Sequence, residues 1–460
     1  MQSSTQLFSF GGPCVPLKMD PSMPQEPYTR TRGEAMTSVH WGQRKLLLSE
    51  VELFLYYVPW GQPVLAVYAG SAPGSHILCL SAMFPHVRFE LYDPAPFDRE
   101  LCKASAIQGN VRKFEIHTGN PGGYFDEVVA HHIAARRVQE GSCPALATFY
   151  RERTTPEKRV SSPAFALQVL FEACMSRCPE SLVFVSDIRS GAEKAADFDE
   201  HVEKDMAAQA LWHRILRPNV SMLKFRLPYA FTTDKDTKQL VPRSPPTVPY
   251  LDGDILLPIW GRQATTETRL VVKGYSPTRV YNIAQYDAQL VWLNKTLRQK
   301  THFAYAPLVD PSLGIDHRFD GAAEVQVLKD YVVGARKEAV GHARRTVLSN
   351  LFPQSESQSE DDVVASFVSY LCEVLQSTVT EKADHRDRCI VKRAREALHG
   401  PQSVQLAEDR HALERKERAR LLWWQSGVER GAGVAGGEGG DARGGTGVGC
   451  PSWSLNPLPK

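Results

Sequence analysis

Short apolar runs alternate with amphipathic segments over the first 300 residues. The run VLAVYAG at 64–70 has the length and composition of a buried parallel strand. Before it, GQRKLLLSEVELFLYYV at 42–58 places apolar residues at helical spacing, which predicts an amphipathic helix. Strands that alternate with helices predict a mostly parallel α/β sheet. Further strands are expected at 87–93, 112–118, 181–187, 221–228 and 268–272, and further helices at 76–84, 165–177 and 203–216.

The pattern changes after about residue 300, where strand signals fade and helices are expected at 325–352, 361–377 and 406–425. The polar stretch around 355–360 is expected to be disordered, and the glycine-rich stretch 427–449 cannot bury a core. The expected organisation is an extended N-terminal arm over 1–40, an α/β domain over 41–300, a helical C-terminal extension over 301–425 and a disordered Gly-rich tail over 426–460.

The composition favours a globular protein and gives no indication of a membrane segment or a metal site. With 42% hydrophobic and 23% charged residues, the chain is expected to be globular with a sizeable core. A formal net charge of +2 means that a nucleic-acid surface would have to be a local basic patch. Nine cysteines without paired metal-ligand spacing indicate reduced thiols and an intracellular protein without a metal site. Neither a signal peptide nor an apolar run of about 20 residues is found, so no membrane segment is expected.

A glycine-containing turn, GSAPG, follows the strand expected at 64–70. Gly70 and Gly74 allow the backbone to approach a ligand and to direct free N–H groups at it. The spacing departs from GxGxxG, and a tight turn between strand and helix explains it equally well. Asp93 ends the next strand, where a carboxylate can accept hydrogen bonds from a ribose diol. The pair indicates a nucleoside cofactor, either S-adenosylmethionine or NAD.

Six short blocks between Gln43 and Asn294 together resemble the poxvirus-type cap-specific mRNA 2′-O-methyltransferases. The resemblance implies a Rossmann-like S-adenosylmethionine-dependent methyltransferase fold in the α/β class, here with a helical C-terminal extension that has no counterpart. In poxviruses the protein is also the stimulatory subunit of poly(A) polymerase. The blocks are, in order, GQRKLLLSE, YAGSAPGSHI, VSDIRS, MLKFRLPY, TETRL and QYDAQLVWLN.

The resemblance implies a catalytic tetrad of Lys45, Asp187, Lys224 and Glu267. The reaction would transfer a methyl group from S-adenosylmethionine to a ribose 2′-hydroxyl near the 5′ cap of RNA. An ordinary lysine has a pKa of about 10.4 and is protonated at neutral pH. A second lysine nearby lowers the pKa of the first, whereas the carboxylates raise it. Lys224 is therefore assigned as base or hydroxyl orienter, with the other three setting its position and field.

Two binding pockets are implied by the same resemblance. The family's basic residue two positions after Asp93 is Ala95 here, and an acid of the cap pocket is replaced by Phe231. Aromatic faces suit the delocalised positive charge of a methylated guanine, and a carboxylate suits its edge. The methyl-donor pocket is expected to contain Gln43, Tyr68, Gly70, Gly74, Asp93, Thr118 and Asp187, and the cap pocket Tyr28, Arg226, Tyr229 and Asp287.

Several alternatives stay open. One is an RNA-binding subunit of an RNA-processing complex, with or without catalysis. Another is an FtsJ-like ribosomal or transfer RNA 2′-O-methyltransferase, which shares the tetrad but has no need of Tyr28, Tyr229 or Asp287. An NAD oxidoreductase is a more distant alternative, since GxGxxG is missing. Capped RNA is the expected partner, the C-terminal helices could bind a protein, and the nucleus, or alternatively the cytoplasm, is the expected location.

Overall fold

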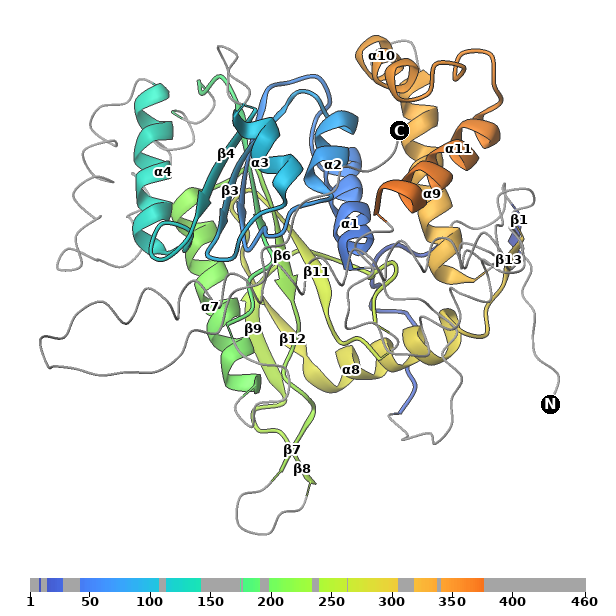
Figure 1. The fold of residues 1–460 in the computed structure, drawn as a ribbon. Helices are drawn as coiled ribbons and strands as arrows, with labels where there is room; N and C mark the ends of the chain where they lie inside the picture. The colour runs from blue at the N-terminus through green and yellow to red at the C-terminus, as the bar shows by residue number, and fades with distance from the viewer. Residues whose placement is uncertain are drawn as a thin grey trace, which may run out of the picture. The chain divides into compact units, whose positions relative to one another are not determined.

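A seven-stranded sheet forms from the apolar runs of the sequence (Figure 1). In this computed structural model, the described residues are 8–9, 15–27, 42–106, 113–141, 174, 177–190, 198–233, 240–262, 264–304, 318–336 and 341–375. The strands of the sheet are β2 (Val64–Ala69), β3 (Val87–Asp93), β4 (Phe114–Thr118), β5 (Ser181–Ser186), β6 (Val220–Phe225), β10 (Asp254–Leu256) and β11 (Thr268–Lys273).

The order of the strands is β10-β11-β6-β5-β2-β3-β4. Neighbouring strands from β4 to β6 are parallel, whereas β11 runs antiparallel to both β6 and β10. This order and these directions are those of the Rossmann-like methyltransferase fold, so the predicted fold class is confirmed. The short edge strand β10 was not predicted, because three residues carry too little periodicity.

Helices cover both faces of the sheet, with α4 and α7 on one and α1 and α2 on the other (Figure 1). All six residues of β2 are buried, which explains why this strand is continuously apolar. The helices are α1 (Gly42–Tyr56), α2 (Ile77–Met83), α3 (Arg99–Ala106), α4 (Glu127–Glu140), α7 (Phe198–Leu216) and α8 (Ile283–Trp292), which continues as the π-helix η2 (Leu293–Leu297). Among the described residues, two-stranded sheets also form. They pair β1 (Phe8–Ser9) with β13 (Phe303–Ala304), β7 (Phe231–Thr233) with β8 (Leu240–Pro242), and β9 (Thr247–Leu251) with β12 (Thr278–Asn282).

In the described part of the chain after residue 304, the helices are α9 (Phe319–Arg336), α10 (Gly341–Leu351) and α11 (Glu360–Leu375). The stretch predicted to be helical at 325–352 forms two helices, the second part of α9 and the whole of α10. A straight helix of that length would extend about 42 Å. Two shorter helices allow α10 to pack back against α9, where Val347 and Leu348 are buried.

The polar stretch between α10 and α11 is ordered, so the prediction of disorder is wrong there. Nη2 of Arg336 donates hydrogen bonds to the carbonyl oxygens of Ser355 (2.7 Å) and Gln358 (2.9 Å). Ser359 caps α11, since its hydroxyl oxygen accepts from the backbone N–H of Asp362 at 3.2 Å. Hydrogen bonds from a distant arginine and a helix cap therefore hold a segment whose composition alone indicates flexibility.

Other predictions lie outside the described residues. These are the helix at 406–425, the tail over 426–460 and nearly all of the helix at 165–177. The segment 15–27 of the predicted arm is described, and backbone hydrogen bonds attach it to β10 and the residue that follows β10. Met19 N–H donates to the Ile255 carbonyl at 2.7 Å, and Leu257 N–H donates to the Leu17 carbonyl at 2.8 Å.

Gly70 makes the turn at the end of β2, with a φ of +79°. A Cβ at this position would lie 2.9 Å from the backbone carbon of Asp187 and from the nitrogen of Ile188. The glycine therefore allows the ends of β2 and β5 to come together. Gly74 has a φ of +66°, and a Cβ there would meet the Leu101 side chain at 2.9 Å, inside the turn.

We expect Gly70→Ala to destabilise the fold more than Gly61→Ala. Gly61 also has a positive φ, +86°, but a Cβ there would meet nothing within 4 Å. The control thus isolates the cost of the left-handed conformation, about 1–2 kcal/mol. Gly70→Ala adds a backbone clash, for which an extra loss of about 1–3 kcal/mol is expected. Urea unfolding measures both free energies, and equal losses would contradict the close approach of β2 and β5.

Candidate functional site

Four charged side chains from separate elements meet at the edge of the sheet where the parallel strands end. Lys45 lies in the first turn of α1, and Asp187 directly follows β5. Lys224 lies within β6. Glu267 directly precedes β11, which is antiparallel, so its first residues lie beside the last residues of β6. The structure therefore brings together the four residues that the sequence singled out.

The contacts within this cluster are ion pairs. Lys45 Nζ lies 2.9 Å from Glu267 Oε1. Lys224 Nζ lies 3.3 Å from Asp187 Oδ1 and 3.4 Å from Glu267 Oε2, so it contacts both carboxylates. The four side chains are between 12% and 23% exposed, so each is mostly buried but retains some contact with solvent. Their catalytic roles remain predictions, whereas their proximity is a feature of the structure.

Two arginines that were not predicted complete the cluster. Arg269 Nη2 lies 2.6 Å from Asp187 Oδ1, and its Nη1 lies 3.0 Å from Glu267 Oε1. Arg189 Nη2 lies 3.4 Å from Glu267 Oε2. Each arginine stands two residues after one of the two acids. Because side chains two residues apart in a strand share a face, this spacing was an available signal for Arg269.

The ion pairs determine the charge of the cluster. Burial lowers the pKa of Lys45, although Glu267 acts in the opposite direction. Burial alone would raise the pKa of Asp187, but Arg269 and then Lys224 outweigh it, and the pKa lies below its usual value. The pKa of Glu267 lies well below its usual value, because Lys224 and Lys45 outweigh the effect of burial. Both carboxylates are therefore ionised at neutral pH.

Gln43 links the start of α1 to the glycine turn after β2. Its Oε1 accepts a hydrogen bond from the Ser75 hydroxyl at 3.1 Å and lies 2.8 Å from Nδ1 of His76. Nε2 of His76 lies 3.0 Å from Oε1 of Glu50, one helix turn beyond Lys45. These contacts hold the glycine turn against the helix that carries Lys45.

Asp93 and Thr118 lie next to each other at the ends of β3 and β4, where they are partners in the sheet register. The Asp93 carboxylate accepts from the backbone N–H groups of Ala72 at 3.0 Å and Ala95 at 2.8 Å. The Thr118 hydroxyl donates to the Ala95 carbonyl at 3.0 Å. A carboxylate offers about four acceptor sites, so Asp93 retains capacity for further donors.

Two buried polar groups that interact with each other, the Tyr68 hydroxyl and the Glu50 carboxylate, lie on this side of the site. Among the described residues, neither the Tyr68 hydroxyl nor Oε2 of Glu50 has a hydrogen bond of ordinary geometry. Burial, with Glu50 and Asp187 nearby, raises the pKa of Tyr68 well above its usual value, so its hydroxyl remains a donor. Buried polar groups of this kind normally have a partner. The surroundings of Gln43 are therefore suited to the polar end of a ligand.

Tyr229 lies just beyond β6 and is 47% exposed. The Arg226 guanidinium covers one of its faces, 4.3 Å from the ring centroid, and lies 4.5 Å from the ring centroid of Phe198. Arg226 is itself buried and pairs with Asp199 at 3.3 Å. The structure thus places Arg226 behind Tyr229, and a stacking ligand would use the opposite face.

Asp287 lies close to the backbone that follows Tyr229. Its Oδ2 accepts from the Ala230 N–H at 2.8 Å, while its Oδ1 is buried and has no hydrogen-bond partner among the described residues. Burial raises the pKa of Asp287 to about 6, and Asp199 adds to this effect. Phe231, at the position of the missing acid, is exposed. Tyr28 lies outside the described residues.

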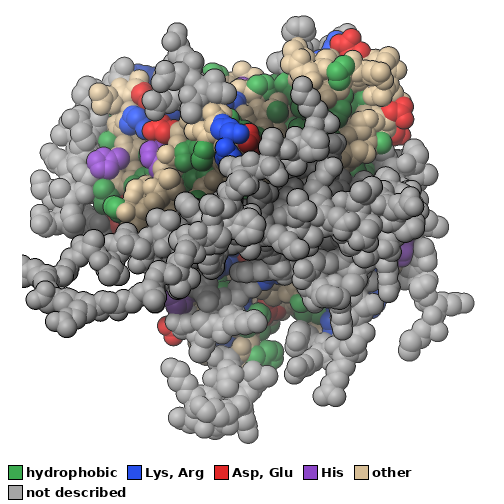
Figure 2. Space-filling view, in the orientation of Figure 1, with side chains coloured by type: hydrophobic (Ala, Val, Ile, Leu, Met, Phe, Trp, Pro, Cys, Tyr) green, Lys and Arg blue, Asp and Glu red, His purple; other side chains and the backbone are tan. Residues whose placement is uncertain are grey.

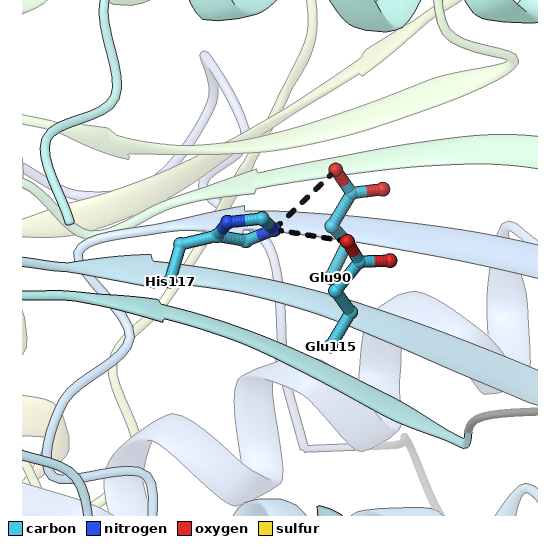
Figure 3. Close-up of side chains that lie close together, drawn as sticks. All are labelled: Glu90, Glu115 and His117. Carbon is cyan, nitrogen blue, oxygen red and sulfur yellow. Dashed lines mark ion pairs between the residues drawn. The ribbon is translucent and has the colours of Figure 1, made fainter. Parts of the chain in front are cut away.

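Glu90, Glu115 and His117 form a separate cluster on β3 and β4 (Figure 3). Nε2 of His117 lies 3.5 Å from Glu115 Oε1 and 3.9 Å from Glu90 Oε1. Glu90 also pairs with Arg136 at 2.5 Å, and the Tyr92 hydroxyl donates to its other oxygen at 2.5 Å. A cation already neutralises Glu90, so we describe the cluster as an ion-pair network.

Charges are mixed elsewhere on the surface. On the face shown in Figure 2, the visible Lys and Arg side chains of the described residues lie among Asp and Glu side chains. Within the described part of the chain, no helix combines the length and apolar character needed to span a membrane.

Asp287→Asn is expected to stabilise the protein at neutral pH. The folded-state pKa of about 6 lies above the unfolded value of about 3.9, so ionisation destabilises the wild-type fold as the pH rises between them. The amide keeps an oxygen acceptor for Ala230. The variant should therefore melt at a higher temperature above pH 6, and the gain should vanish below about pH 4. Thermal unfolding from pH 3.5 to 8 checks this, and a gain that is independent of pH would contradict it.

The chain matches no protein-family model and no curated protein sequence. Among solved structures, it is similar to bluetongue virus VP4, described as a multifunctional RNA-capping production-line, with 11% sequence identity and a TM-score of 0.30. The likeness covers 61% of this chain and 35% of the VP4 chain, so this chain spans little more than a third of that protein's length.

Proposed function

We propose that the protein transfers a methyl group from S-adenosylmethionine to the ribose 2′-hydroxyl of a nucleotide near the 5′ cap of RNA, as in the poxvirus-type family that its sequence resembles. The observation that carries this proposal is the cluster of Lys45, Asp187, Lys224 and Glu267 at the carboxyl edge of a methyltransferase-type sheet. Ligands of open α/β sheets bind at this edge.

The residues near the glycine turn fit the methyl donor. Asp93, with spare acceptor capacity at the end of β3, would accept hydrogen bonds from the ribose hydroxyls. Gln43 and the Tyr68 hydroxyl, which remains a donor, would hold the amino-acid end. Thr118, next to Asp93 in the sheet, completes this side of the pocket. No basic residue stands at Ala95, so any such contact would come from another part of the chain.

S-adenosylmethionine supplies an electrophilic methyl group on a positively charged sulfur. The protein has to orient the 2′-hydroxyl and provide for its proton. Lys224, held between two carboxylates, is positioned to bind the hydroxyl oxygen as orienter or to accept its proton as base. Lys45 fixes Glu267 from the other side. Four cationic side chains face the two carboxylates, and this excess of positive charge suits a polyanion such as RNA.

The exposed face of Tyr229 favours a capped RNA over ribosomal or transfer RNA. An exposed aromatic face binds a methylated, positively charged guanine by stacking, and Asp287, which holds the backbone just after Tyr229, would accept from the edge of the base. A single experiment tests the proposed function. The protein is incubated with labelled methyl donor and either capped or uncapped RNA, and the modified nucleotide is mapped. Labelling of base atoms, or no preference for capped RNA, would contradict it.

Lys224→Ala is expected to lower kcat at least about hundredfold, the scale of acid–base or orienting contributions. The protein should still fold, because Asp187 and Glu267 keep Arg269 as a partner. Donor affinity, measured by calorimetry, should be unchanged. Lys273→Ala, at the exposed end of β11, is the control and should keep full activity. A Lys224→Ala variant within about tenfold of wild type would exclude this lysine as base or orienter.

Tyr229→Ala is expected to weaken binding of capped RNA by roughly tenfold, since stacking on a cation is worth about 0.5–2 kcal/mol. Binding of uncapped RNA of the same sequence should hardly change, because it depends on phosphate contacts. Tyr275→Ala, which removes another exposed tyrosine, should affect neither. Equal losses on both RNAs would place Tyr229 in the general RNA path and favour the ribosomal or transfer RNA alternative.

A further inference from the structure

A buried ion pair connects the first turn of α1 to the helical extension. Arg44 and Glu324 of α9 are 280 residues apart in sequence, and both are almost completely buried. Nε of Arg44 donates to both carboxylate oxygens of Glu324, at 2.9 Å and 3.1 Å, and its Nη2 donates to Oε1 at 2.5 Å. A guanidinium held at two nitrogens cannot rotate or slide without losing a bond.

The same helix also holds the loop that leads to Glu267. The indole Nε1 of Trp260 donates to Glu324 Oε2 at 2.6 Å, and its backbone N–H donates to Asp320 Oδ1 at 2.7 Å. Trp260 has a φ of +57°, which is unfavourable for a large side chain, so the surrounding contacts hold it there. Asp320 in turn pairs with the buried Arg298.

These contacts converge on one pair of the tetrad. Arg44 stands between Gln43 and Lys45 in the chain, and Trp260 lies seven residues before Glu267. Lys45 and Glu267 form the 2.9 Å ion pair, so α9 holds the segments that carry both of its members. Removing one partner of a buried ion pair leaves the other uncompensated. The first turn of α1 would then lose its buried attachment to Glu324.

We propose that Glu324 is a positioning residue that fixes Lys45 and Glu267 from behind the site, so that α9 is part of the catalytic architecture. This inference rests on the proposed function, since it assigns Glu324 a part in the same methyl transfer. Glu324 makes its contacts through Arg44 and Trp260 and acts only through them.

The test compares Glu324→Gln with a matched control, Tyr56→Phe. Tyr56 lies at the other end of α1, and its hydroxyl donates to Asp330 of α9 at 2.7 Å, so the control removes a contact between the same two helices away from the site. For Glu324→Gln, kcat on capped RNA should fall at least about tenfold, with the KM for RNA nearly unchanged, because misplaced catalytic groups cost rate. Tyr56→Phe should keep the wild-type kcat.

Hydrogen–deuterium exchange supplies a second measurement that requires no activity. In Glu324→Gln, exchange of amides in the first turns of α1, residues 42–48, should rise, whereas β2 and β5 should stay protected. If Glu324→Gln does not fold, Trp260→Phe replaces it, since it removes the indole N–H that donates to Glu324 together with part of the ring beside Arg44, and kcat should fall in the same direction. Wild-type protein without methyl transfer would refute the proposed function. An active wild type with an unchanged kcat in a folded Glu324→Gln, or an equal loss in Tyr56→Phe, would overturn the positioning role alone.

Discussion

The antiparallel pairing of β11 with β6 is the constraint on which the site depends. Parallel strands bring only their carboxyl ends to this edge of the sheet, as Asp93 and Asp187 show. A reversed strand contributes its first residues to the same edge, and so Glu267 and Arg269 arrive beside Lys224. If every strand were parallel, these two side chains would lie at the opposite edge, and Lys224 would have one carboxylate instead of two.

The same pairing creates an electrostatic problem that the cluster itself resolves. Lys224 and Arg269 are directly opposite each other in the register, and like charges in such positions repel. Asp187 and Glu267 each contact both cations, so the repulsion is offset at the point where it arises. Each charge is thus kept in place by its neighbours, which makes the cluster one cooperative unit rather than a set of independent contacts.

Much of this arrangement could be predicted from the sequence, because the central strands are buried on both faces and therefore read as apolar runs. The end of each run located Gly70, Asp93 and Asp187. Arg269 was overlooked although its spacing from Glu267 is that of one strand face. The position of Lys45 alone does not indicate a catalytic role, since a lysine at the start of a helix is ordinarily solvated. Only the resemblance to a family predicted that it belongs to the site.

Other features were beyond any local pattern. Helical periodicity continues from α9 into α10, so the sequence does not show where the chain turns back. The pairing of Arg44 with Glu324 depends on how the chain folds over a separation of 280 residues, and charged residues alone do not reveal their partners. Order in the polar stretch between α10 and α11 likewise depends on Arg336, which belongs to another helix.

The buried contact of α9 with α1 also bears on where the folding unit ends. The inner faces of α9 and α11 supply buried apolar side chains to the core that contains the sheet, among them Leu328, Tyr331 and Phe367. A polypeptide that ended near residue 300 would expose the apolar surface of α1. It would also remove Glu324, the carboxylate that compensates the buried charge of Arg44. The folding unit that contains the sheet therefore includes α9 and α11, and the start of α1 depends on α9 for the partner of its buried arginine.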